Sequence, residues 1–172
     1  MALIDSTPEG QVNKYSILAG ASYMIPIPGV AVLANAGIQL AMYFAINKAM
    51  GVKLSKNKVK CIGTFLASQV AGLGWASLLE FAKLIPGVGM FTAVAQCVMV
   101  GSVTYACGMA YLKILENVDL ERVSEDKIQD VLVANTPSEQ EMEAWRKHGA
   151  DMLKKEKSNM KARVSEAKIY AN

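Results

Sequence analysis

The chain has 172 residues, 52% of them hydrophobic, and a formal net charge of +3 at pH 7. This length suits one domain with a substantial core. The charges are segregated: residues 1–115 hold three acids and eight lysines, whereas residues 116–172 hold twelve acids and ten bases. The sequence therefore predicts an apolar body and a densely charged tail, and the acids interspersed among the bases of the tail argue against a nucleic-acid partner.

Two elements are expected before the first turn, a polar lead-in at residues 1–13 and a short helix at residues 14–24. The first residues carry acids and lack a basic start before an apolar stretch, so no secretory signal is expected. The helix should end before the prolines, because the residue that precedes a proline is pushed out of the helical region. Pro26, Pro28 and Gly29 are then expected to turn the chain.

Three longer helices are expected in the rest of the body, which spans residues 14–115. They cover residues 30–50, about 59–82 and about 89–115, and a solvated lysine-rich connection joins the first two. Long runs without charge lie in these helices, and a membrane helix needs roughly 20 mostly apolar residues. Membrane segments are therefore expected, although the buried helices of a soluble homo-oligomer would give similar runs.

The sequence Ile-Pro-Gly-Val occurs twice, at residues 27–30 and 85–88, with helices expected on both sides of each copy. This repeat predicts an all-α fold of two antiparallel helical hairpins, the second with its tip at Pro86 and Gly87, followed by a charged helical tail. The lysine-bearing ends would then share one side. Positive charge beside membrane segments favours the cytoplasmic face, so the lysine loop and the tail are expected there.

Small residues recur every four positions along the apolar helices, a spacing at which membrane helices approach closely. An alanine-rich sequence also produces this spacing by chance, and both explanations stay open. Polar residues within these helices, among them Asn35, Gln39 and Thr104, are candidates for hydrogen bonds between helices. The candidate positions for helix packing are Gly37, Ala41, Gly63, Ala67, Gly101 and Ala106.

The tail is expected to hold a helix at residues 124–134 and a longer one that begins at residues 136–139 and runs past Val164. A capping threonine, a proline at the first helical position and a glutamate after it predict this second start. The apolar stripe of the longer helix packs on the body of the chain, binds a partner or a second copy, or lies on a membrane. Its residues are Met142, Trp145, Met152 and Leu153.

No catalytic, metal-binding or cofactor-binding pattern is found in the sequence. The single histidine, His148, lies on the charged tail helix, and the three cysteines lack the spacing of a disulfide framework or a zinc site. The apolar body offers neither paired carboxylates nor a nucleophile beside a histidine. The glycine-rich turns lack the lysine and the hydroxyl residue of a phosphate loop. We therefore expect a protein that is not an enzyme and needs no metal or cofactor.

The apolar body, over residues 15–115, resembles the bacterial domain-of-unknown-function 697 family. The motifs that carry the resemblance are Ile25-Pro26-Ile27-Pro28-Gly29, Gln39-Leu40-Ala41-Met42, Gly51-Val52, Leu84-Ile85-Pro86-Gly87-Val88-Gly89 and Thr104-Tyr105-Ala106-Cys107-Gly108. The resemblance implies a membrane-linked helical domain that often follows a GTPase domain, so a separate GTPase is a candidate partner. The family commonly places an acid shortly after its first turn, where this chain has Val30-Ala31-Val32, and no role of that acid is carried over.

These observations favour a small, non-enzymatic membrane protein that scaffolds, shapes or anchors a membrane. Its expected partners are the lipid bilayer and further copies of the chain, and its tail would bind a cytoplasmic protein or itself. One alternative is a soluble structural protein whose apolar body is buried by homo-oligomerisation. A second alternative is a pore or channel, for which polar residues would have to line a path.

Overall fold

The computed structural model of the chain describes residues 6–24, 30–72, 93–156 and 163–171. These residues form helices joined by short connections, and no strand occurs among them, which confirms the predicted all-α fold class. Both turns of the Ile-Pro-Gly-Val repeat lie outside these ranges, so the hairpin tips stay predictions. Their residues are Pro26, Pro28, Gly29, Pro86 and Gly87.

The first helix, α1, spans Pro8–Ser22 and starts before the expected residue 14, so that boundary was wrong. The hydroxyl of Thr7 accepts a hydrogen bond from the Gly10 amide at 3.0 Å and caps the helix. Pro8 takes the first helical position. Proline is tolerated there because a backbone N–H at this position has no hydrogen-bond acceptor within the helix. Most of the expected polar lead-in is therefore helical.

The next two helices are α2, Val30–Met50, and α3, Lys56–Gly72. The bounds of α2 are the predicted ones. Gly51 follows it with a φ of +73°, in the left-handed region that glycine adopts at low cost. α3 starts before the expected residue 59, because the Ser55 hydroxyl accepts a hydrogen bond from an amide in its first turn. The predicted continuation of this helix past Gly72 lies outside the described residues.

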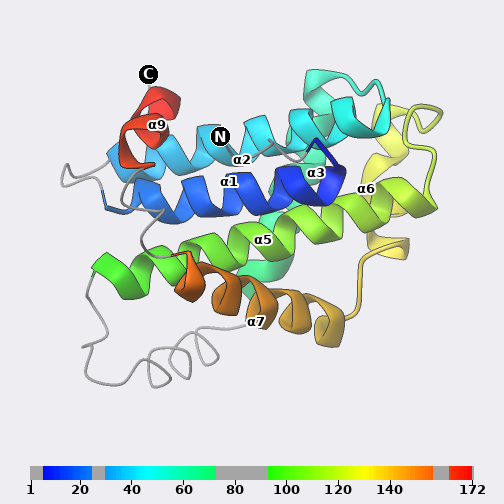
Figure 1. Cartoon of the computed structure of the whole chain (residues 1–172). Coiled ribbons are helices and arrows are strands. Elements are labelled where there is room, and N and C mark those ends of the chain that lie inside the picture. The colour runs from blue at the N-terminus through cyan, green and yellow to red at the C-terminus, as the bar shows by residue number, and fades with distance from the viewer. Residues whose placement is uncertain (1–5, 25–29, 73–92, 157–162, 172) are drawn as a thin grey trace.

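The helix α5, Ala93–Asn117, runs through the middle of the bundle, with α1 on one side and α7 on the other (Figure 1). It packs against α1, α2, α3 and α7. Along its length Cys107, Tyr111 and Ile114 are fully buried. Burial of a large apolar side chain contributes about 1.5–3 kcal/mol, so the contacts of α5 with four other helices stabilise the core.

The tail begins with a short 3-10 helix, η1 (Glu125–Lys127), and α6 (Ile128–Ala134), and then forms α7 (Glu139–Lys155). Two expectations are corrected here. Ser138, not the threonine before the proline, caps α7, because its hydroxyl and the Glu141 carboxylate form a reciprocal capping box. α7 ends at Lys155 instead of running past residue 164, and a separate helix, α9 (Val164–Lys168), is followed by η2 (Ile169–Ala171).

The tail and the apolar body share one hydrophobic core. α7 returns along α5, and α9 and η2 pack on α1 and α2 at the far end of the bundle (Figure 1). Leu132, Leu153 and Ala167 of the tail belong to the same buried cluster as Leu18 and Ile38 of the body. The change in composition near residue 116 therefore does not separate two cores, and the tail reaches both ends of the bundle.

Candidate functional site

A line of polar side chains runs through the interface between α2 and α5. Gln39 donates a hydrogen bond from its amide nitrogen to the Thr104 hydroxyl at 3.5 Å, which confirms the expected polar contact between helices. Further along, the Tyr111 hydroxyl donates to the Asn47 side-chain oxygen at 2.9 Å. Tyr43 lies between these two pairs, and its ring centroid is 4.6 Å from that of Tyr111.

On α2 this line follows every fourth residue, Asn35, Gln39, Tyr43 and Asn47, a spacing that places side chains on one face of a helix. Asn35 Oδ1 and Asn47 Nδ2 are buried without a hydrogen-bond partner in the described part of the chain. Asn35 and Gln39 were predicted to form hydrogen bonds between helices. Tyr43 and Asn47 were not, although the same spacing of four residues connects them to the first two. None of the four side chains is charged at neutral pH, so the line suits alignment of two helices better than proton transfer.

The lysine-rich connection between α2 and α3 is bonded to the acidic segment that follows α5. Lys58 Nζ donates to the backbone carbonyls of Leu120 and Glu121, at 3.0 and 3.2 Å. The Ser55 hydroxyl donates to the Glu125 carboxylate at 2.9 Å. The Lys58 ammonium, one of the positive charges predicted for this loop, therefore forms hydrogen bonds within the protein.

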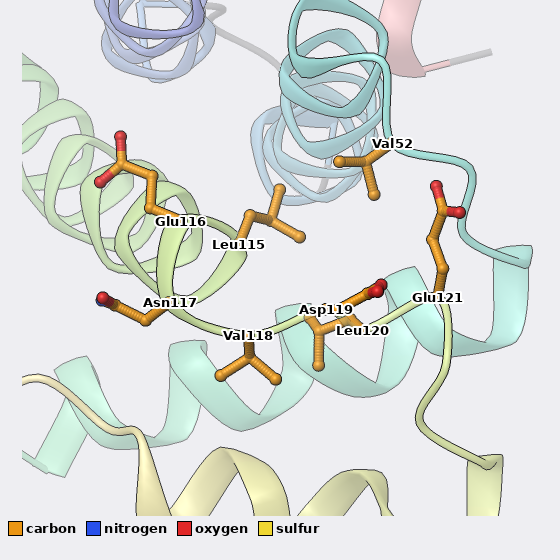
Figure 2. Close-up of a pocket in the computed structure, with 8 residues that line it drawn as sticks. All are labelled: Val52, Leu115, Glu116, Asn117, Val118, Asp119, Leu120 and Glu121. Atoms are coloured by element: carbon orange, nitrogen blue, oxygen red, sulfur yellow. The ribbon is translucent and has the colours of Figure 1, made fainter.

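A pocket of about 320 Å³ lies beside this contact, between Val52 and residues 115–121. Figure 2 shows Val52 and Leu115 pointing toward one another, whereas the carboxylates of Glu116 and Glu121 lie on opposite sides. Cation ligands would have to converge on one point, and these do not. Across the described ranges, no group of three or more His, Cys, Asp or Glu side chains is placed to hold a metal ion.

The residues considered for catalysis lie apart from this pocket. His148 is exposed on α7, and its ring packs on Tyr105 with a centroid distance of 5.5 Å. Cys97 and Cys107 are buried as free thiols, and Cys61 is exposed on α3. Two of the three thiols are therefore enclosed in the core, and the histidine makes a ring contact on the surface of α7.

The three glycines among the candidate packing positions lie at close contacts. A Cβ atom built on Gly37 or on Gly101 would lie 2.5 or 2.8 Å from a backbone carbonyl oxygen of another element. A Cβ on Gly63 would lie 2.7 Å from the ring of Tyr43. Larger side chains at these positions would force the helices apart.

The alanines among the candidate packing positions differ in their surroundings. Ala106 of α5 is fully buried, in a cluster with Val70 of α3 and Met142 of α7. Ala67 lines a groove between α2 and α3, and Ala41 is half-buried on α2. These six positions thus lie at contacts within the chain, and a role of this stripe inside a membrane stays a prediction.

The apolar stripe of α7 faces the core of its own chain. Leu153 is fully buried and Met142 is 4% exposed, while Trp145 and Met152 are half-buried against the core. Leu153 fits over Gly101, where a Cβ would lie 2.6 Å from its side chain. Of the alternatives left open by the sequence, the structure therefore favours packing on the body, and these four side chains are not free for a partner.

The outward side of α2 carries exposed apolar side chains. Leu33 is 62% exposed and Phe44 is 38% exposed, although both are large and hydrophobic. Ala36 is also exposed and Leu40 is half-buried between them. Exposed apolar residues gathered on one helix face are typical of an interaction surface.

An open groove of about 360 Å³ lies between this side of α2 and α3. Leu40 and Tyr43 line it from α2, and Lys60, Gly63 and Thr64 line it from α3. The amide of Gln39 adds a polar group to the α2 wall, and Val59 and Ala67 add apolar side chains to the α3 wall.

One described helix has the length and apolar character needed to cross a membrane. It is Ala95–Asn117 within α5, with a mean hydropathy of 1.4, and 72% of its most apolar window is buried inside the protein. The core helix of a soluble protein has the same properties. The stretch alone therefore does not distinguish a spanning helix from a core helix.

The chain is similar to a bacterial membrane protein. This relative is the magnetosome membrane protein 22 of Magnetospirillum gryphiswaldense, 32% identical over 116 residues, which are 66% of this chain. The chain spans about 60% of the length of that relative. No family model matches the chain, so the resemblance to the domain-of-unknown-function 697 family is unconfirmed, and no solved structure matches it.

Proposed function

We propose that this protein is a membrane-associated, non-enzymatic helical protein that scaffolds or anchors other components at a membrane. The observation that carries the proposal is the similarity to a relative that is named for its membrane, at 32% identity over 116 residues. The partners in this proposal are the lipid bilayer and further copies of the chain. Its side of action is the cytoplasmic one, because the anionic inner leaflet attracts lysine-rich segments.

The structure supports association through a surface more readily than insertion of separate hairpins. α5 is the apolar centre of the bundle. It is covered by α1, α2 and α3 of the body and by α7 of the tail. A spanning α5 would have to lose these contacts or take them into the bilayer. The exposed leucine and phenylalanine of α2, in contrast, can reach a membrane while the fold stays intact.

The second candidate is a soluble homo-oligomeric structural protein. The burial of α5 inside its own chain favours it, because the bundle then needs no lipid to cover its most apolar helix. The same exposed residues of α2 would in that case contact another copy.

Flotation of the full-length chain with the membranes of an expressing bacterium separates the two candidates. If the protein associates with membranes, it should rise with the lipid fraction in a density gradient without detergent. A carbonate wash then distinguishes a docked protein, which the wash releases, from an inserted one, which it does not. A soluble, large and monodisperse particle that stays in the dense fractions would contradict the proposed function.

A further inference from the structure

We propose that the outer face of α2, with the lysines at its end and on α3, docks on an anionic lipid surface. This inference rests on the proposed function and specifies the part of the molecule and the class of lipid. We define the α2 face as Leu33, Ala36, Leu40, Phe44 and Lys48. Successive members are three or four positions apart, which places them on one side of the helix.

The apolar part of the α2 face is already turned toward solvent. Leu33 and Phe44 are 62% and 38% exposed, so no refolding is needed before they meet lipid. A helix that lies on a membrane buries its apolar face about 5–10 Å deep, at the boundary of headgroups and acyl chains. Ile169, 69% exposed in η2, adds an apolar side chain near the same helix, because η2 packs on α2.

The charges around the α2 face determine which lipid it fits. No acid occurs between Glu9 and Glu80 in the sequence, so α2 and α3 carry only positive charge. Lys48, Lys56 and Lys60 are exposed on these two helices. A juxtamembrane lysine contributes binding free energy on an anionic leaflet, and these lysines would add to the apolar contact.

None of the acids lies on α2 or α3. They are concentrated after α5 and along α7, and Figure 1 shows α7 on the side of the bundle opposite to α2. Some acids lie nearer to α2 and α3. Glu166 of α9 pairs with Arg163 at 3.1 Å, and Glu121 and Glu125 accept hydrogen bonds from the Lys53 amide and the Ser55 hydroxyl, just before α3. The acids of α7 would therefore face away from an anionic membrane when the α2 face is docked.

The groove between α2 and α3 extends this surface. Leu40 and Tyr43 form the apolar part of its α2 wall, beside Gln39. Lys60 and Thr64 lie on the opposite wall. An anionic headgroup above the groove would meet the Lys60 ammonium and a hydroxyl, while acyl carbon would contact the apolar part of the α2 wall.

A second copy of the chain is a poorer occupant of the α2 face. In a two-fold symmetric contact the same patch of both copies meets, so two surfaces whose charges on α2 and α3 are all positive would face one another. No acid stands on α2 or α3 to offset this repulsion. The charge pattern therefore favours an anionic surface over self-association through this face.

The test is flotation of the purified full-length chain with two kinds of vesicle, phosphatidylcholine alone and phosphatidylcholine with about one third phosphatidylglycerol. We expect binding to the anionic vesicles and little binding to the neutral ones. Salt at about 1 M, where the Debye length is about 3 Å, should weaken the binding.

Matched variants locate the surface. Lys48→Gln with Lys60→Gln should lower partitioning roughly 30-fold, at about fivefold for each lysine. Lys147→Gln with Lys155→Gln, also exposed but on α7, should leave partitioning within about twofold of the wild type.

The apolar contact is tested separately. Leu33→Gln with Phe44→Gln should lower partitioning at least roughly tenfold, whereas Val133→Gln, at a site 64% exposed on α6, should not. Circular dichroism checks that each variant is folded.

The outcomes separate the inference from the proposed function. Equal binding to both vesicle types, or wild-type binding by the α2-face variants, would overturn this inference while membrane association in cells stands. A dimer in the absence of lipid that Leu33→Gln with Phe44→Gln converts to a monomer would assign the face to self-association instead. Absence of binding to vesicles and to native membranes alike would overturn both.

Discussion

Asn47 and Tyr111 show how single residues hold α2 against α5. The Asn47 side chain is 4% exposed, Tyr111 is fully buried, and the hydroxyl of the tyrosine donates to the amide oxygen at 2.9 Å. Tyr111→Phe leaves this oxygen buried without its donor, which should lower the free energy of unfolding by about 1–3 kcal/mol. Urea unfolding followed by circular dichroism measures the change.

The double variant Asn47→Leu with Tyr111→Phe is the control for this pair. It removes both polar groups and keeps a similar volume, so it should be less destabilised than the sum of the two single variants. Additive losses would mean that the hydrogen bond contributes little and that packing alone determines the stability.

The sequence predicts part of this interface and misses the rest. Gln39 and Thr104 were recognised as polar groups that bond between helices, and they do. Tyr43 and Tyr111 were not, because a tyrosine in an apolar run reads as a core side chain until its hydroxyl is placed. Which polar group faces which depends on the rotation of each helix about its axis, and a single sequence leaves that rotation open.

At the scale of elements, α7 is held to α5 by a charged contact at its first turn. Glu141 pairs with the Lys113 ammonium and also accepts hydrogen bonds from the Ser138 amide and hydroxyl. The hydrogen bond from Lys113, followed by those from Ser138, lowers the pKa of Glu141 to about 2. The folded state therefore favours the ionised carboxylate more than the unfolded chain does.

This shift gives stability a pH dependence with a defined sign. The contribution of Glu141 is complete above its unfolded pKa of 4.5 and is lost as the pH falls toward its folded pKa of about 2. Glu141→Gln should therefore lower the melting temperature at pH 7 and flatten its fall between these two pH values. Melting temperatures from pH 7 to pH 2 measure this, with Glu139→Gln, exposed in the same turn, as the control. Parallel curves for Glu141→Gln and the wild type would contradict the assignment.

Helix starts illustrate what local sequence can and cannot predict. A threonine followed by a proline occurs at residues 7–8 and again at residues 136–137. In the first case the threonine caps a helix, whereas in the second its hydroxyl donates to the Leu132 carbonyl at 2.7 Å and Ser138 caps α7. The two settings differ in what precedes them, since α6 ends just before Thr136 and its last carbonyls accept that hydroxyl.

At the scale of the whole molecule, η2 closes the far end of the bundle. The Tyr170 ring meets Tyr15 of α1 edge-on, with centroids 6.3 Å apart, and its backbone covers Gly37 of α2. Tyr170→Ala should lower the free energy of unfolding by about 1–3 kcal/mol, because it removes apolar contacts with two helices. Thermal unfolding compares it with Ile169→Ala, a change at a site 69% exposed that should stay within about 0.5 kcal/mol. Equal losses in both variants would show that η2 is not docked.

The separation of charge in the sequence distinguishes an apolar region from a densely charged region, but it does not predict how the two pack together. Residues 116–172 were expected as a tail beside the body, and the apolar stripe of α7 was visible. An amphipathic stripe predicts that one face of a helix is buried, but it does not predict which element or molecule covers that face. Here the partner is α5, so the helix that looked most like a membrane span is covered by the segment that looked most soluble.

The cover of Gly37 by Tyr170 has a consequence for the time course of synthesis. The two residues lie at opposite ends of the chain, so the ribosome makes α2 long before it makes η2. At about 5–20 residues per second, the interval is roughly 7–27 s. During it, Gly37 is without the backbone that covers it in the folded chain, so this end of the bundle can close only after synthesis of the last helical turn.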